Sequence, residues 1–176
     1  MRRAALMTGL AATIILVVTP AHSQKPSAAC KLLEVAEIES ALGGKAAKGP
    51  SGASDPSMAL DTCSVEIKVP GKGGNRTVGI LIVKNLSMDG AEAVRIRNGA
   101  RARESQWKVP GARLEERTIG DAICAIYGRP NIASHSTCTI PRGKGYLEVD
   151  VTTPALDEVV PMDAVRALVQ KAASRL

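Results

Sequence analysis

The chain has 176 residues and a net charge of +6, and only 2% of its residues are aromatic. Its length suits one domain with one core, and the modest positive charge falls short of a typical nucleic-acid-binding domain. Proteins that stack single-stranded bases use aromatic side chains, so the composition argues against that class and predicts no nucleic-acid partner.

Residues 1–23 have the layout of a cleavable signal peptide. Arg2 and Arg3 supply positive charge, an uncharged apolar run follows, and Ala21 and Ser23 are small residues before the expected cleavage site. The run is shorter than the roughly 20 residues that span a bilayer as a helix. We therefore expect residues 24–176 to form a single periplasmic or secreted domain without a transmembrane segment; retention of the leader as an anchor is the alternative.

Cys30 suggests a second way to hold the chain at a membrane. The residues before it loosely resemble a lipobox, the motif that precedes a lipid-modified cysteine. However, the usual leucine is absent three residues before Cys30, and Pro20 and Pro26 separate the cysteine from the apolar run. The sequence thus favours release over lipid anchoring at Cys30.

Helical and strand patterns alternate in the first half of the exported part. Apolar residues recur at helical spacing over 31–42, and Gly43-Gly44 ends that helix. Residues 45–60 are rich in Gly, Pro and Ser and are expected to be an irregular connection. Strands are predicted at 63–69 and 78–83, joined by a loop, and a basic helix is predicted at 87–105.

Strands dominate the second half of the chain. They are expected at 114–119, 122–127, 136–140 and 147–151, and Pro161 precedes a closing amphipathic helix. The order helix, strands, helix, strands, helix predicts an α+β domain. We expect an antiparallel sheet of about five to seven strands packed by three helices.

The four cysteines, Cys30, Cys63, Cys124 and Cys138, are predicted to form two disulfides, because an even number is typical of exported domains. Cys124 and Cys138 lie at equal distances from the centre of a predicted hairpin turn, where cross-strand side chains are close enough to bridge. That pairing leaves Cys30 for Cys63. The chain has no Cys-x-x-Cys motif, and His135 is its only histidine after the leader, so neither a metal ion nor a cofactor is expected.

Several short motifs resemble those of known envelope domains. Residues 30–44 read Cys-x-Leu-Leu-x-x-x-x-Ile-Glu-x-Ala-Leu-Gly-Gly, with Cys63 further on, Ile119-Gly120-Asp121-Ala122 later, and a Gly-Lys-Gly turn before Tyr146. Together with the closing helix, they resemble small extracytoplasmic domains found as bacterial envelope lipoproteins and as sensor domains of membrane Ser/Thr kinases. The resemblance implies an α/β sandwich with disulfides and a ligand-binding or sensing role. It carries over no functional residue.

The predicted basic helix and the residue just beyond its end supply candidate anion-binding residues. Arginine binds phosphate and carboxylate groups through paired hydrogen bonds. Nearby glutamates can pair with some of these cations at helical spacing, so a solvated helix face is the alternative interpretation. The candidates are Arg95, Arg97, Arg101, Arg103 and Lys108.

These observations favour a non-enzymatic envelope domain that binds either a small ligand or a protein partner. An anionic ligand is among the candidates. One alternative is a small exported hydrolase in which His135 acts with an adjacent serine and with Asp121 or Asp150. Adjacent residues on a strand point to opposite faces, which argues against that triad. The other alternative is a protease-inhibitor-like module whose reactive loop lies at Arg129-Pro130.

Overall fold

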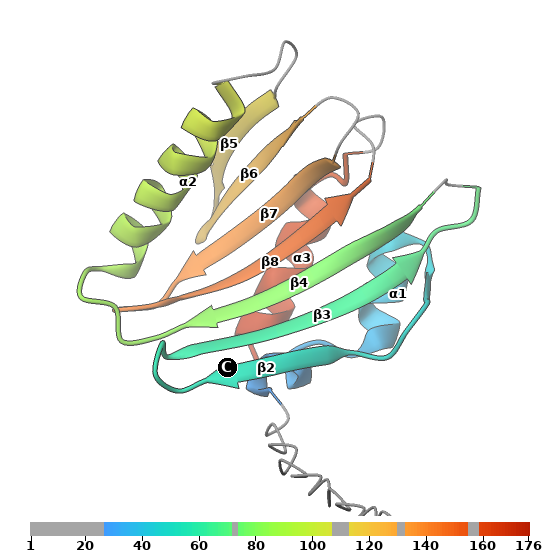
Figure 1. Ribbon diagram of the computed structural model, residues 1–176, viewed down its shortest axis with the longest axis horizontal. Helices are drawn as coiled ribbons and strands as arrows, with labels where there is room; N and C mark the ends of the chain where they lie inside the picture. The colour runs from blue at the N-terminus through green and yellow to red at the C-terminus, as the bar shows by residue number, and fades with distance from the viewer. Residues whose placement is uncertain (1–26, 72–73, 107–112, 130–132, 155–158) are drawn as a thin grey trace, which may run out of the picture.

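Figure 1 shows a computed structural model that describes residues 27–71, 74–106, 113–129, 133–154 and 159–176. One antiparallel sheet with the strand order β1-β3-β4-β8-β7-β6-β5 dominates it, and β2 pairs with β3 on the same edge as β1. The strands are β1 (Lys45–Ala46), β2 (Ser51–Asp55), β3 (Leu60–Lys68), β4 (Asn75–Val83), β5 (Arg113–Ile119), β6 (Ala122–Arg129), β7 (Ala133–Pro141) and β8 (Tyr146–Thr153).

The helices cover the sheet on both sides. A short 3-10 helix, η1 (Ala28–Lys31), lies with α1 (Val35–Leu42) and α3 (Met162–Ala173) on one face, and α2 (Gly90–Gln106) lies across β5 to β8 on the other (Figure 1). The structure confirms the predicted α+β fold with three α-helices and two disulfides. No helix in the described ranges is long and apolar enough to cross a membrane, and the predicted leader lies outside those ranges.

The sheet has eight strands, because the predicted irregular connection at 45–60 contains β1 and β2. This segment lacks the apolar alternation of a half-buried strand, since four of the five residues of β2 are exposed at the sheet edge. Backbone pairing with β3 makes it a strand: Ser51 to Asp55 run opposite Ser64 to Leu60. Backbone pairing with a neighbouring strand thus overrides the weak preference of these residues for an irregular conformation.

The predicted helix at 31–42 begins later in the structure, as α1 from Val35, and the 3-10 helix η1 ends at Lys31 before it. Ser27 Oγ accepts a hydrogen bond from Ala29 N at 3.2 Å and begins η1. Glu34 then precedes α1, and its backbone N–H donates to Glu37 Oε2 at 2.9 Å. This hydrogen bond satisfies the backbone N–H of Glu34 at the start of α1, so a second helix can begin there.

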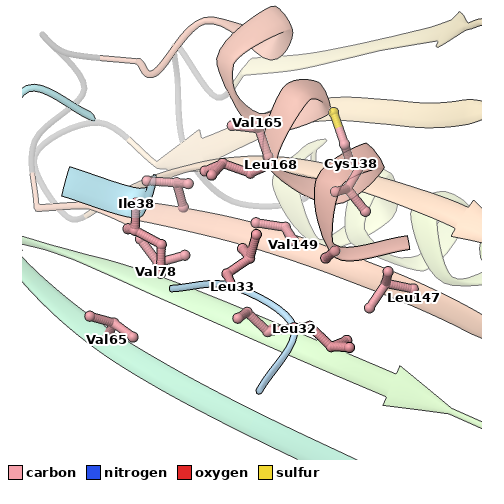
Figure 2. Packing of buried hydrophobic residues seen from close by; sticks show 14 of the residues in the cluster. Leu32, Leu33, Ile38, Val65, Val78, Cys138, Leu147, Val149, Val165 and Leu168 are labelled. Atoms are coloured by element: carbon pink, nitrogen blue, oxygen red, sulfur yellow. The ribbon is translucent and has the colours of Figure 1, made fainter. Parts of the chain in front are cut away.

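The main hydrophobic core lies between the sheet and the layer of η1, α1 and α3. Figure 2 shows Leu33, Ile38 of α1, Val78 of β4, Val149 of β8 and Val165 of α3 gathered in it. Ile38, Val78, Val149 and Val165 are 0% exposed, and burial of each such side chain stabilises the fold by about 1.5–3 kcal/mol. Alternate residues of each central strand face this core, so the polar residues between them face α2 or solvent.

Both predicted disulfides are present. Cys124 and Cys138 are direct partners across β6 and β7, with their Cα atoms 4.1 Å apart, and Cys30 is bonded to Cys63 with a Cα distance of 5.0 Å. Two structural disulfides are typical of a protein in an oxidising compartment. The Cys30 thiol is used in its disulfide, so this form of the chain cannot carry a lipid on that sulfur.

An ion-pair cluster at the surface joins α1 to α3. The carboxylate of Glu37 accepts two hydrogen bonds from Arg175, each 2.7 Å long, and Lys171 Nζ lies 2.7 Å from it. Hydrogen bonds from Arg175 and then Lys171 lower the pKa of Glu37 from its ordinary value of 4.5 to about 2.

We expect the substitution Glu37→Gln to lower the free energy of unfolding at neutral pH and to have no such effect in strong acid. A carboxyl with a lowered folded-state pKa stabilises the protein above its unfolded-state pKa. That contribution is lost as the pH falls through the folded value. Urea denaturation at a series of pH values should show the full difference above about pH 5, and the difference should shrink toward zero as the pH falls through and below about 2. A difference that is unchanged at the lowest pH would contradict this account.

Candidate functional site

The sheet face opposite the main core carries a buried charged cluster beneath α2. Glu148 of β8 is 3% exposed, and its carboxylate pairs with Arg97 and Arg101 of α2. Arg101 contributes two contacts, of 3.2 and 3.3 Å, and Thr139 of β7 donates to Glu148 at 2.9 Å. A buried carboxylate needs such partners, since an unpaired charge is strongly unfavourable away from water. The cluster therefore holds α2 on the sheet.

Both tyrosines of the chain extend this cluster. The guanidinium carbon of Arg97 lies 4.8 Å from the ring centre of Tyr146, and that of Arg101 lies 4.9 Å from the ring centre of Tyr127. Arg97 also donates a hydrogen bond of 2.6 Å to the Tyr146 hydroxyl. Cations are attracted to the negative faces of aromatic rings, so these contacts add to the attachment of α2.

Of the candidate anion-binding residues that the structure describes, two belong to the buried cluster and two are exposed. Arg97 and Arg101 are engaged by the buried carboxylate, and Arg95 and Arg103 are exposed on α2. Lys108 lies outside the described residues. Anion binding by this helix stays a prediction. Arg95 and Arg103 could bind an anion without disturbing the buried cluster.

His135 of β7 lies on the same face, beside Tyr127. The two rings stack with 4.6 Å between their centres and 2° between their planes. His135 Nδ1 lies 3.3 Å from both carboxylate oxygens of Asp150 and 3.1 Å from Thr152 Oγ1. Burial and then the negative charge of Asp150 raise the pKa of Tyr127 to about 12, so its phenol stays neutral and donates to Asp150 at 3.4 Å.

This arrangement contains one part of the hydrolase alternative. His135 meets Asp150, whereas Asp121 instead accepts a hydrogen bond from α3 at 3.4 Å. Ser134 and Ser136 are buried on the opposite side of β7, as strand alternation requires. The adjacent serines and the His135–Asp150 pair are therefore on different faces of the sheet, and these residues do not assemble a serine triad.

A basic pocket of about 280 Å³ lies at one end of the sheet. The cross-strand neighbours Val83, Tyr146 and Pro141 stand at this end, so the segment 84–89 after β4 lies beside the turn 142–145 between β7 and β8. Two backbone hydrogen bonds join these connections: Leu86 N to the carbonyl of Lys144 at 2.8 Å, and the amide of residue 90 to the carbonyl of residue 143 at 2.7 Å.

Two backbone features hold the connections in this position. A Cβ on Gly90 would stand 1.9 Å from the carbonyl oxygen of Gly145, so only glycine permits the approach. Asn85 has a φ of 54°, in the left-handed region that asparagine adopts more readily than most residues. Backbone conformations of this kind cluster at ligand-binding positions.

The basic pocket combines a cationic rim with an apolar floor. Lys84, Arg142 and Lys144 are exposed at its rim, whereas Ile82 and Tyr146 are 1% and 8% exposed. None of the nine described residues that line the pocket has an acidic side chain. A concave site with a few convergent polar groups is the usual form of a small-ligand site. Its charge suits an anion.

The sequence did not reveal this pocket, because its cations come from two connections that are far apart along the chain. Each looks like an ordinary polar turn, and only sheet pairing brings Lys84 beside Arg142 and Lys144. The available signal was the repeated placement of cations immediately after apolar strands.

Neither the family models nor the curated proteins that were compared with this chain match it. The described residues contain no group of three or more His, Cys, Asp or Glu side chains that could hold a metal ion. Arg129 ends β6, while Pro130 lies outside the described residues, so the inhibitor-like loop stays a prediction.

Proposed function

We propose that this protein is an exported, non-enzymatic domain of the bacterial cell envelope, periplasmic or secreted, that binds a small anionic ligand in the basic pocket. The observation that carries the proposal is the convergence of Lys84, Arg142 and Lys144 on a pocket whose described lining residues include no acidic side chain. The leader and the two disulfides support export.

The chemistry of the rim favours a phosphate or carboxylate group. Arg142 can donate two parallel hydrogen bonds to such a group, and the two lysines add point charges. The Asn85 side chain offers a neutral donor at the same rim. The apolar floor leaves room for a short uncharged portion of the ligand.

The double substitution Lys84→Glu/Lys144→Glu is expected to weaken binding of glycerol phosphate by about tenfold or more, because each charge-assisted hydrogen bond contributes about 1.5–3 kcal/mol. Both side chains are exposed, and the structural hydrogen bonds of these residues use their backbone groups. The fold should therefore persist. Amide chemical-shift titration of the wild type and variant with glycerol phosphate measures the effect and locates the site.

The matched control is Arg95→Glu/Arg103→Glu, which makes the same change in charge on exposed positions of α2. We expect it to bind glycerol phosphate as the wild type does. Loss of binding in this control, with binding retained in the Lys84→Glu/Lys144→Glu variant, would place the anion on α2 and overturn the proposal.

A further inference from the structure

The turn end of the sheet, defined by the connections 56–59, 84–89 and 142–145, has the composition of a lipid-binding surface. We infer that this end docks on an anionic lipid bilayer, with a phosphate-bearing headgroup in the basic pocket and two methionines at the boundary between headgroups and acyl chains. The inference rests on the proposed anion-binding role of the pocket and names the source of the anion.

The three connections lie side by side. Leu60, Val83, Tyr146 and Pro141 are successive cross-strand neighbours at this end of β3, β4, β8 and β7. The amide of Lys84 donates to the carbonyl oxygen of residue 59 at 3.0 Å, which fixes the first connection against the second. Figure 1 shows the three turns together, at the left of the view. They form one continuous surface.

Apolar side chains gather on this surface. Five large apolar residues are exposed in the described part of the chain, and three of them belong to this end: Met58 at 65%, Met88 at 37% and Leu176, which lines the basic pocket, at 53%. Methionine is flexible and polarisable and adapts to an irregular apolar environment. Exposed apolar side chains that are grouped beside cations mark an interaction surface.

The charges of the turn end complement an anionic surface. Lys84, Arg142 and Lys144 are exposed there, and the acidic side chains of Asp55 and Asp89 accompany them. Asp55 accepts hydrogen bonds from Ser57 N and Oγ at 2.9 and 2.6 Å, within its own turn. Asp89 accepts from the amide of residue 91 at 2.9 Å, at the N-terminus of α2. These carboxylates are therefore occupied locally, whereas Lys84 and Lys144 are exposed at the rim of the basic pocket.

A bilayer fits this combination better than a free anion alone. Basic residues are attracted to anionic headgroups over about a Debye length, and apolar side chains enter the headgroup boundary once the protein is close. A dissolved phosphate would use the cations and leave Met58 and Met88 in water. The methionines therefore distinguish the membrane from a soluble ligand.

The test is cosedimentation with vesicles of phosphatidylcholine and with vesicles of phosphatidylcholine and phosphatidylglycerol in equal parts. We expect binding to the anionic vesicles to be roughly tenfold or more tighter than to the neutral ones, and to weaken with salt. The substitution Met58→Ser/Met88→Ser should weaken vesicle binding at least severalfold and leave binding of soluble glycerol phosphate unchanged. Ile96→Ser, at an exposed apolar position of α2, is the control and should bind as the wild type does.

The outcomes separate this inference from the proposed function. If the protein binds glycerol phosphate but does not distinguish anionic from neutral vesicles, the bilayer inference is wrong and the anion pocket stands. If Ile96→Ser weakens vesicle binding as much as Met58→Ser/Met88→Ser does, the turn end is not the docking surface. If neither glycerol phosphate nor anionic vesicles bind, both proposals fail.

Discussion

Replacing Glu148 by alanine is expected to lower the free energy of unfolding by about 3–5 kcal/mol, the usual effect of removing one partner from a buried ion pair. The carboxylate side chain is 4% exposed, and the arginines that it holds, Arg97 and Arg101, are 22% and 20% exposed. Without Glu148 these two cations would lose the buried carboxylate that they share beneath α2. Urea denaturation followed by circular dichroism measures the loss.

Glu115→Ala is the matched control for this prediction. Glu115 also pairs with an arginine, Arg117, but it stands on the edge strand β5 and its side chain is 44% exposed. Surface ion pairs contribute about 0–1 kcal/mol, so this variant should unfold almost as the wild type does. Equal losses in the two variants would show that the buried cluster has no special role in stability.

A second measurement isolates the charge effect from the loss of packing. In the background Arg97→Ala/Arg101→Ala, the substitution Glu148→Ala should be less destabilising than in the wild type by at least about 1 kcal/mol, because the two cations that share this carboxylate are then absent. Additive effects would mean that Glu148 stabilises the protein through packing alone, and our account of how α2 is attached would be wrong.

Glu148 also illustrates what the sequence could and could not predict. The alternation around Val149 and around Val65 predicted the half-buried strands and their apolar side correctly, because a period of two is a local property. The same alternation placed Glu148 on the polar face of the sheet, where a side chain is expected to be exposed to solvent. Its burial depends on α2 crossing that face, and a basic helix without an apolar stripe gives no local sign of that position.

The edge of the sheet and the basic pocket were missed for a related reason. Residues 51–55 form β2 because the backbone of β3 offers unpaired donors and acceptors, and no side-chain pattern records this. The pocket depends on Lys84 and Lys144 meeting across paired strands. Local patterns therefore identified most elements of the fold, whereas sites assembled from distant connections required the three-dimensional structure.

Cysteine pairing was predictable because one pair is symmetric about a hairpin, and its removal should have the second large effect. We expect Cys124→Ala/Cys138→Ala to lower the free energy of unfolding by about 3 kcal/mol, and Cys30→Ala/Cys63→Ala by about 4 kcal/mol. The order follows from the sequence separations, 14 residues and 33 residues, because a longer closed loop restricts the unfolded chain more.

The control for both disulfide variants is denaturation with and without a thiol reductant. The wild type should lose stability when it is reduced, and each variant should respond only through its one remaining disulfide. Of the four cysteines, Cys63, Cys124 and Cys138 are at most 2% exposed, so the alanine substitutions also remove buried volume and the measured losses should reach or exceed the loop-closure values. A variant without Cys30 and Cys63 that is as stable as the wild type would show that this bridge does not anchor η1 to β3. The chain around η1 would then be held by other contacts, such as the burial of Leu32 and Leu33, which are 5% and 4% exposed, and the 3.0 Å hydrogen bond from Arg175 Nη1 to the Leu32 carbonyl.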